Sequence, residues 1–132
     1  MRFSIQPDAT TPIYEQIITQ MVFAIARGDL SVGTLVPSVR ELAGRILVHP
    51  NTVARAYQEL ERQGILETKR GRGMEVTPAA LSLCQHQRRE HIRGRLRDAL
   101  REAMAGALTE AEVLELVADE WGHLNGHRPL ES

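Results

Sequence analysis

Polar side chains that suit hydrogen bonding to a nucleic acid gather in residues 49–76. Asn51 and Thr52 stand at the expected start of a helix. Arg70 and Arg72 stand in a glycine-rich tip further along. An asparagine amide can form two hydrogen bonds with adenine, a threonine methyl can contact the methyl group of thymine, and an arginine can bind phosphate or guanine. The segment therefore predicts a surface that contacts DNA.

The full set of predicted DNA contacts includes the helix that comes before. Arg40 would lie one turn into that helix, where it could reach a phosphate or a guanine. The predicted DNA-binding residues are Ser38, Arg40, His49, Asn51, Thr52, Arg55, Arg70, Gly71 and Arg72.

Each of these signals has an ordinary structural alternative when it is taken alone. Asn51 and Thr52 could merely cap a helix, and Arg55 could pair with Glu59 at the i+4 position. A basic hairpin tip is more often only a solvated turn. The signals occur in a defined order: a capped short helix, a tight turn, a polar helix start and a basic hairpin. That order favours DNA contact over the separate alternatives.

Three helices are expected to position these residues. Thr11 followed by proline predicts a first helix with a hydroxyl cap, and Gly28 predicts its end. Ser38-x-x-Glu41 is a capping box that starts the second helix. Proline after His49 starts the third. Two helices joined by so tight a connection are typical of a helix-turn-helix.

Two short alternating segments flank the glycine-rich tip and predict a β-hairpin. A hairpin directly after the second helix of a helix-turn-helix is a wing. The predicted fold is mostly α with this small hairpin. It comprises a winged helix-turn-helix in residues 1–78 and a two-helix C-terminal dimerisation or effector segment in residues 79–132.

Two amphipathic helices are predicted in residues 79–132, with a second capping box at Thr109 and Glu112. So short a segment cannot bury both apolar faces alone, and pairing with a second copy of the chain is the economical solution. The predicted dimerisation residues are Ile92, Leu96, Leu100, Met104, Val113, Leu114, Val117 and Trp121. Six arginines crowd residues 88–101, and five acidic residues follow in 110–120. These runs could be solvated faces, or they could pack against each other within a chain or between chains.

The composition bounds the compartment. Nothing in the 132 residues approaches the apolar run of about 18 residues that a membrane span needs, and no apolar leader precedes a cleavage site. The expected compartment is the cytoplasm, with no membrane partner. The single cysteine, Cys84, excludes an intramolecular disulfide and fits a reducing environment.

Residues 36–76, VPSVRELAGRILVHPNTVARAYQELERQGILETKRGRGMEV, resemble the winged helix-turn-helix of the GntR family of bacterial repressors. The upstream TPIYEQI and the short two-helix tail resemble its YtrA-type subfamily. The resemblance implies a homodimer that binds a palindromic operator in double-stranded DNA and that could control a transporter operon. It also implies that Arg40, Asn51, Thr52, Arg55 and the wing tip contact the DNA.

The sequence departs from the family pattern at three positions. Leu47 stands where the family usually has glycine in the turn, so the turn geometry could differ. Val36 replaces the usual leucine, a mild change. His49 stands where serine or asparagine is common at the helix cap, and histidine titrates near neutral pH, so operator binding could depend on pH.

Other functions fit the sequence less well. An enzyme is not expected, because no Ser/His/Asp set, P-loop or dinucleotide motif is present. A metal-responsive regulator would use His123 and His127, four residues apart, but a site needs three or four converging ligands. A winged helix can also serve only as a protein-interaction module, although a polar, arginine-rich face argues against that use. No cofactor is expected. A small-molecule effector remains open and its identity is unknown.

Overall fold

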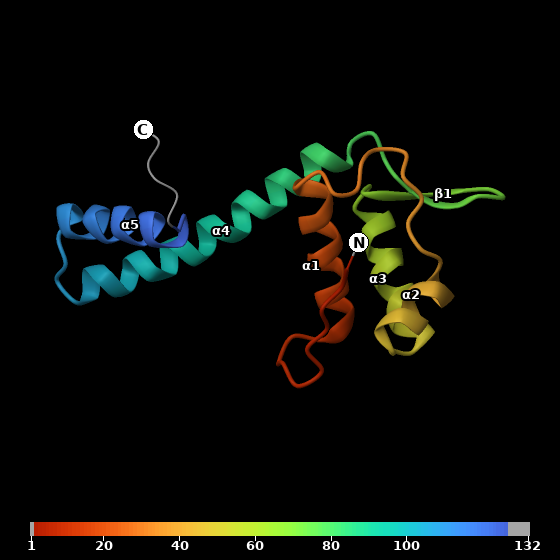
Figure 1. Ribbon diagram of the computed structural model, residues 1–132, viewed down its shortest axis with the longest axis horizontal. Helices are drawn as coiled ribbons and strands as arrows, with labels where there is room; N and C mark the ends of the chain where they lie inside the picture. Colours follow the sequence, from red (N-terminus) through yellow and green to blue (C-terminus); the bar gives the residue numbers. More distant parts are fainter. Residues whose placement is uncertain (1, 127–132) are drawn as a thin grey trace. The chain divides into compact units, whose positions relative to one another are not determined.

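Seven secondary-structure elements follow one another in the part of the chain that the structure describes, residues 2–126 of a computed structural model (Figure 1). They are α1 (Ile13–Ala26), α2 (Val39–Ile46), α3 (Pro50–Arg62), β1 (Leu66–Lys69), β2 (Gly73–Val76), α4 (Ala80–Ala105) and α5 (Glu110–Leu124). The chain forms two compact units that divide between Glu90 and His91, within α4. The mostly helical fold with one antiparallel hairpin is confirmed.

The α2–α3 pair forms as the local signals predict. Ser38 Oγ accepts a hydrogen bond from the Glu41 N–H, and the Glu41 carboxylate accepts one from the Ser38 N–H, which completes the capping box. Pro50 occupies the first turn of α3. The turn between the helices passes through Leu47, whose φ of 57° and ψ of 51° are left-handed. Leu47 therefore adopts a backbone conformation that glycine usually occupies.

The core of the first unit lies where α1, α2, α3 and the hairpin meet. Ile17 and Met21 of α1, Leu42 of α2, and Val53 and Leu60 of α3 are almost fully buried. The Tyr57 hydroxyl donates a hydrogen bond of 2.7 Å to the Pro37 carbonyl and so ties α3 to the connection before α2. This packing holds α2 and the start of α3 as one rigid support.

The first turns of α4 belong to the same unit. Ala80 and Cys84 are fully buried. The Arg88 guanidinium lies 3.7 Å from the centre of the Phe23 ring of α1, and the Gln87 amide donates a hydrogen bond to Gln63 at the end of α3. The start of α4 therefore packs against α1 and α3.

The hairpin pairs Leu66 with Val76 and Glu67 with Glu75 in antiparallel register. Residues 33–36 run along the other edge of β2: the Val76 N–H donates to the Thr34 carbonyl, and the Val36 N–H donates to the Met74 carbonyl. β2 is therefore flanked by hydrogen-bonded chain on both sides.

The segment before α1 is held by two glutamine side chains. Gln20 accepts a hydrogen bond from the Ser4 N–H and donates one to the Ser4 carbonyl. Gln16 makes the same pair of hydrogen bonds with the backbone of Gln6. The prediction of a hydroxyl cap at Thr11 was wrong, because Pro12 is the cap residue of α1 and no side chain caps the helix.

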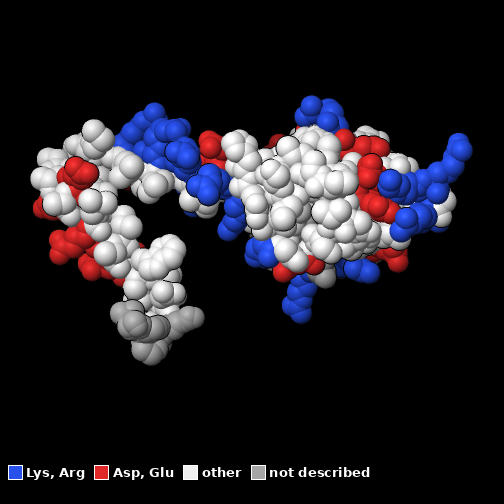
Figure 2. Space-filling model, turned by 90° about the horizontal axis from the view of Figure 1, so that it is seen from above, with Lys and Arg blue, Asp and Glu red and all other residues white. Residues whose placement is uncertain are grey.

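In the second unit, the end of α4 is followed by α5, which starts with the predicted capping box at Thr109 and Glu112. No residue between 91 and 126 is buried. Arginines gather on α4 and acidic residues on α5 (Figure 2). Among the described residues, no helix is long and apolar enough to cross a membrane.

Candidate nucleic-acid interface

The start of α3 presents polar side chains outward. His49 is the cap residue, and its Nδ1 accepts a hydrogen bond of 3.0 Å from the Asn51 N–H. The Asn51 side chain is exposed, and Thr52 is half-buried. The cap function predicted as an alternative for Asn51 and Thr52 therefore belongs to His49, which leaves the Asn51 amide for other contacts. The pH dependence of operator binding stays a prediction.

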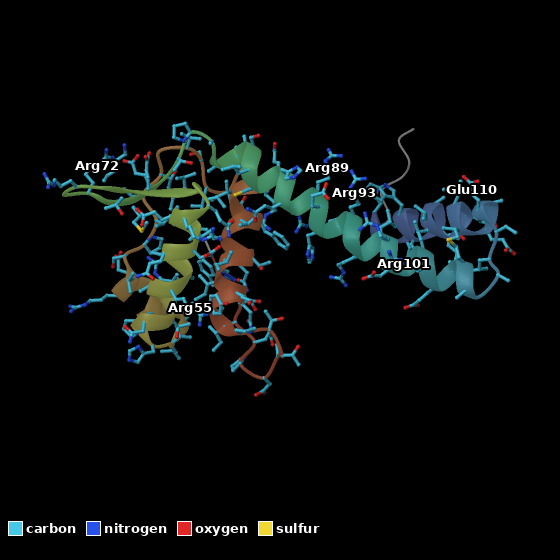
Figure 3. The ribbon with its side chains drawn as sticks, turned by 180° about the vertical axis from the view of Figure 1, so that it is seen from behind. Arg55, Arg72, Arg89, Arg93, Arg101 and Glu110 are labelled. Carbon is cyan, nitrogen blue, oxygen red and sulfur yellow. The ribbon has the colours of Figure 1, made fainter. Side chains whose placement is uncertain are left out.

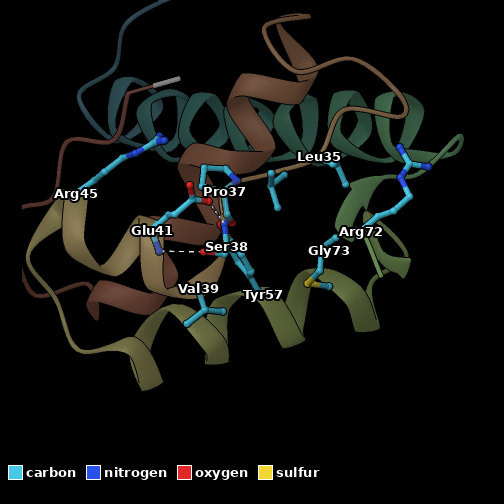
Figure 4. A pocket seen from close by; sticks show the side chains of 11 residues that line it. Leu35, Pro37, Ser38, Val39, Glu41, Arg45, Tyr57, Arg72 and Gly73 are labelled. Carbon is cyan, nitrogen blue, oxygen red and sulfur yellow. Dashed lines mark hydrogen bonds between the residues drawn. The ribbon is translucent and has the colours of Figure 1, made fainter. Parts of the chain in front are cut away.

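A groove of about 560 Å³ separates the start of α2 from the wing (Figure 4). Ser38, Glu41 and Arg45 line its α2 side, and Arg72 and Met74 line its wing side. The structure thus brings Ser38 and Arg72, predicted from separate motifs, to one depression. Arg45 was not among the residues predicted from the sequence. Its position one helical turn after Glu41, on the same face of α2, could have suggested that it lines the groove.

Arg40 is exposed on α2, and Arg70 and Gly71 are exposed at the wing tip. Gly71 has a φ of +76°, a conformation that a side chain would strain, so the tip requires glycine there. The tip lies between β1 and β2 and is closed by a hydrogen bond of 2.9 Å from the Arg72 N–H to the Lys69 carbonyl.

Arg55 lies apart from this groove. Its guanidinium stacks 3.8 Å above the centre of the Tyr14 ring, and both residues line a polar groove between α1 and α3 with Glu15, Glu59 and others. Figure 3 shows Arg55 beside α1 and Arg72 at the wing. The predicted i+4 pair of Arg55 with Glu59 does not form. Arg62 pairs with the Glu59 carboxylate instead.

Hydrogen bonds lower the pKa values of two carboxyl groups, one on α2 and one on α3. Donation from the Ser38 backbone N–H and from its hydroxyl lowers the pKa of Glu41. The Arg62 guanidinium and the Gln63 amide lower the pKa of Glu59 to about 2. Burial raises the pKa of the Tyr57 hydroxyl well above its usual value. Both carboxylates therefore carry full charge at neutral pH, and Tyr57 stays a neutral donor.

The metal alternative gains no ligand set from the structure. Among residues 2–126, no group of three or more His, Cys, Asp or Glu side chains could hold a metal ion. His127, which the sequence pairs with His123, lies outside the described residues.

A short capped α2, a tight turn, α3 with a polar start, and a β-hairpin directly behind it define a winged helix-turn-helix, a class of proteins that bind DNA. Residues 13–76 match the family model of bacterial regulatory proteins, gntR family. The chain is 44% identical over 99 residues to the HTH-type transcriptional repressor YtrA of Bacillus subtilis (strain 168), an alignment that covers 75% of this chain and 76% of YtrA.

Solved structures agree with this assignment. A transcriptional regulator from Oenococcus oeni is 28% identical with a TM-score of 0.76, and the match covers 90% of this chain and 98% of that one. The DNA-binding domain of AraR, solved in complex with operator ORX1, matches 58% of this chain and 96% of its own with a TM-score of 0.52; at 24% identity it shows the fold alone. The chain belongs to the GntR family of transcriptional regulators, which bind DNA and are not enzymes, and its resemblance to YtrA-type members is confirmed.

Proposed function

We propose that the chain is a homodimeric repressor that binds a palindromic operator. Each copy of the chain has one surface that reads the DNA. The observation that carries the proposal is the groove between the start of α2 and the wing, where Ser38 and Arg45 line the α2 side. A duplex backbone running through this groove would place the start of α3 in the major groove and the wing tip over the minor groove. YtrA of Bacillus subtilis is named a repressor, which favours repression over activation.

Within this proposal the predicted contacts keep distinct roles. Asn51 and Thr52 read base edges from the start of α3, and Arg40 binds phosphate from α2. His49 caps α3 and stands at the same helix end. A family regulator of this kind acts in the cytoplasm, and a transporter operon is the proposed target.

A second copy of the chain is the proposed occupant of the apolar face in residues 79–132. An apolar groove of about 370 Å³ lies between α4 and α5, lined by Leu96, Leu100, Val113, Val117 and Trp121 among others. Its residues are exposed or half-buried, and the sole tryptophan, Trp121, is 72% exposed. A free apolar face of this size favours a protein partner over solvent.

The charges of α4 and α5 support a second copy as that partner. Arginines flank the apolar face on α4, while Glu112, Glu115 and Asp119 follow one another on α5. A second copy carries both charges, so the basic helix of one chain can face the acidic helix of the other. Two copies would also supply the two recognition helices that half-sites about one DNA turn apart require. Residues 1–78 thus read the operator and residues 79–132 hold the dimer.

The test is selection of bound fragments from the host genome, with the wild type and an Arg40→Ala, Asn51→Ala double variant side by side. Enrichment of a palindromic motif by the wild type, and its loss in the variant, is the expected result. Failure of the wild type to enrich any motif at low salt would contradict the proposal. Sedimentation at micromolar concentration tests the dimer: only a 14.8 kDa species would exclude it.

A further inference from the structure

The wing tip carries two arginines that the sequence does not distinguish. Arg70 and Arg72 flank Gly71, and both residues are exposed. Their surroundings differ, however, because only Arg72 reaches an acidic partner. Its Nη1 lies 2.9 Å from Oε2 of Glu75, three residues later on β2. No hydrogen bond or ion pair is formed by the Arg70 side chain within residues 2–126.

Glu75 is an unusual partner because it is buried. Its side chain is only 9% exposed, whereas that of Arg72 is 59% exposed. Oε2 makes no directional hydrogen bond within the described part of the chain, so the guanidinium is what balances its charge. Removing the cation from a buried carboxylate is strongly unfavourable, far more than breaking an exposed ion pair.

The sheet explains why no other group takes the place of Arg72. Glu75 lies in the central strand, between β1 and the segment around Leu35. Its register partner on β1 is Glu67, also acidic, so the neighbouring strand adds repulsion rather than compensation. Lys69 lies 3.5 Å from Glu67 and is engaged there. Arg72 is therefore the cation that Glu75 retains.

We propose that Arg70 is the wing's DNA-contacting cation and that Glu75 is a positioning residue that keeps Arg72 in the protein. Arg72 is held against Glu75 of β2. Arg70, the other arginine of the tip, enters the narrow minor groove, whose negative potential attracts a free guanidinium. The inference rests on the proposed function and divides the predicted wing contacts into one that binds DNA and one that holds the wing.

The experiment measures the salt dependence of binding to random-sequence duplex DNA, together with the melting temperature, for the wild type and single variants. This probe needs no knowledge of the operator, because phosphate and groove cations contribute to binding of any sequence. For Arg70→Ala we expect affinity to fall roughly tenfold at low salt and the salt slope to fall by about one, with an unchanged melting temperature. For Arg72→Ala we expect a lower melting temperature and an unchanged salt slope.

The pair of variants Arg72→Ala and Arg72→Ala, Glu75→Gln gives the control for positioning. A neutral amide needs no cation, so the second substitution should restore much of the melting temperature that the first removes. A fall of the salt slope in Arg72→Ala that equals the fall in Arg70→Ala, or an unchanged slope in Arg70→Ala, would overturn the inference. Absence of DNA binding by the wild type itself would instead overturn the proposed function.

Discussion

The guanidinium of Arg55 on α3 lies 3.8 Å above the ring of Tyr14 on α1, and this contact joins the recognition helix to the first helix of the fold. The Tyr14 hydroxyl donates to the Glu15 carboxylate at 3.2 Å, so the ring is held from its own helix. A side chain predicted as a DNA contact is thus held by stacking before any DNA arrives.

We expect Tyr14→Leu to lower the free energy of unfolding by about 1 kcal/mol beyond its packing loss, because a cation–π contact at an exposed site contributes about 0.5–1 kcal/mol. Tyr14→Phe keeps the ring and should change little. Urea unfolding of Tyr14→Leu, Arg55→Ala and the double variant isolates the contact. Additive single effects would show that the stack contributes nothing in solution.

Leu47 adopts a left-handed conformation that is costly for a residue with a Cβ, about 1–2 kcal/mol. Its side chain is 88% exposed, so the side chain itself contributes little packing. Leu47→Gly should therefore raise the free energy of unfolding by about 1 kcal/mol.

Leu47→Ala is the matched control, since it removes the exposed side chain and keeps the strained backbone. It should leave stability almost unchanged. A stabilisation by alanine equal to that by glycine would show that removal of the exposed leucine, rather than relief of strain, is responsible.

Local signals predicted the elements well because each acts within a few residues. The capping boxes at Ser38 and Thr109, and the proline after His49, fix helix starts by themselves. The turn at Leu47 adopts the left-handed conformation that favours glycine, although the residue there is leucine, and α2 packs against α3 on either side of it.

Long-range contacts were not predictable from the same signals. Tyr14 meets Arg55 only once α1 packs on α3, and Glu75 is buried in a strand that β1 and residues 33–36 flank. In the sequence, Glu75 is one more charge in a strand with alternating character. The predicted contact and dimerisation residues themselves remain predictions.

Glu59 provides a pH test. Hydrogen bonds from Arg62 and Gln63 lower its pKa in the folded chain from the ordinary value of 4.5 to about 2. A carboxyl with a depressed folded-state pKa stabilises the fold above its unfolded value, and this contribution is lost as the pH falls through the folded value. Thermal unfolding between pH 4.5 and pH 2 should therefore show a smaller loss of melting temperature for Glu59→Gln than for the wild type.

Glu61→Gln, on the same helix, serves as the control for removing one carboxylate from α3. If Glu59→Gln and the wild type lose stability in parallel over this range, the pairing with Arg62 is too weak in solution to couple to protonation.

Trp121 is the only tryptophan and is 72% exposed in the single chain, which makes it a reporter of the proposed dimer. If a second copy covers the apolar face, the emission maximum should lie at short wavelength at micromolar concentration and move to longer wavelength on dilution. Leu100→Glu, in the same groove, should give the long-wavelength emission at all concentrations. An emission maximum of a solvated indole that is independent of concentration in the wild type would contradict the dimer.

The two glutamines that hold the segment before α1 determine where its conformation is encoded. Gln16 and Gln20 bond to backbone groups of Gln6 and Ser4, as a neighbouring strand would, and the Gln16 amide also donates to the Thr11 carbonyl. Any residue except proline offers the same N–H and carbonyl groups. Positions 4 and 6 should then tolerate almost any side chain, while positions 16 and 20 tolerate almost none. The conformation of the first residues is therefore determined by side chains of the helix that follows them.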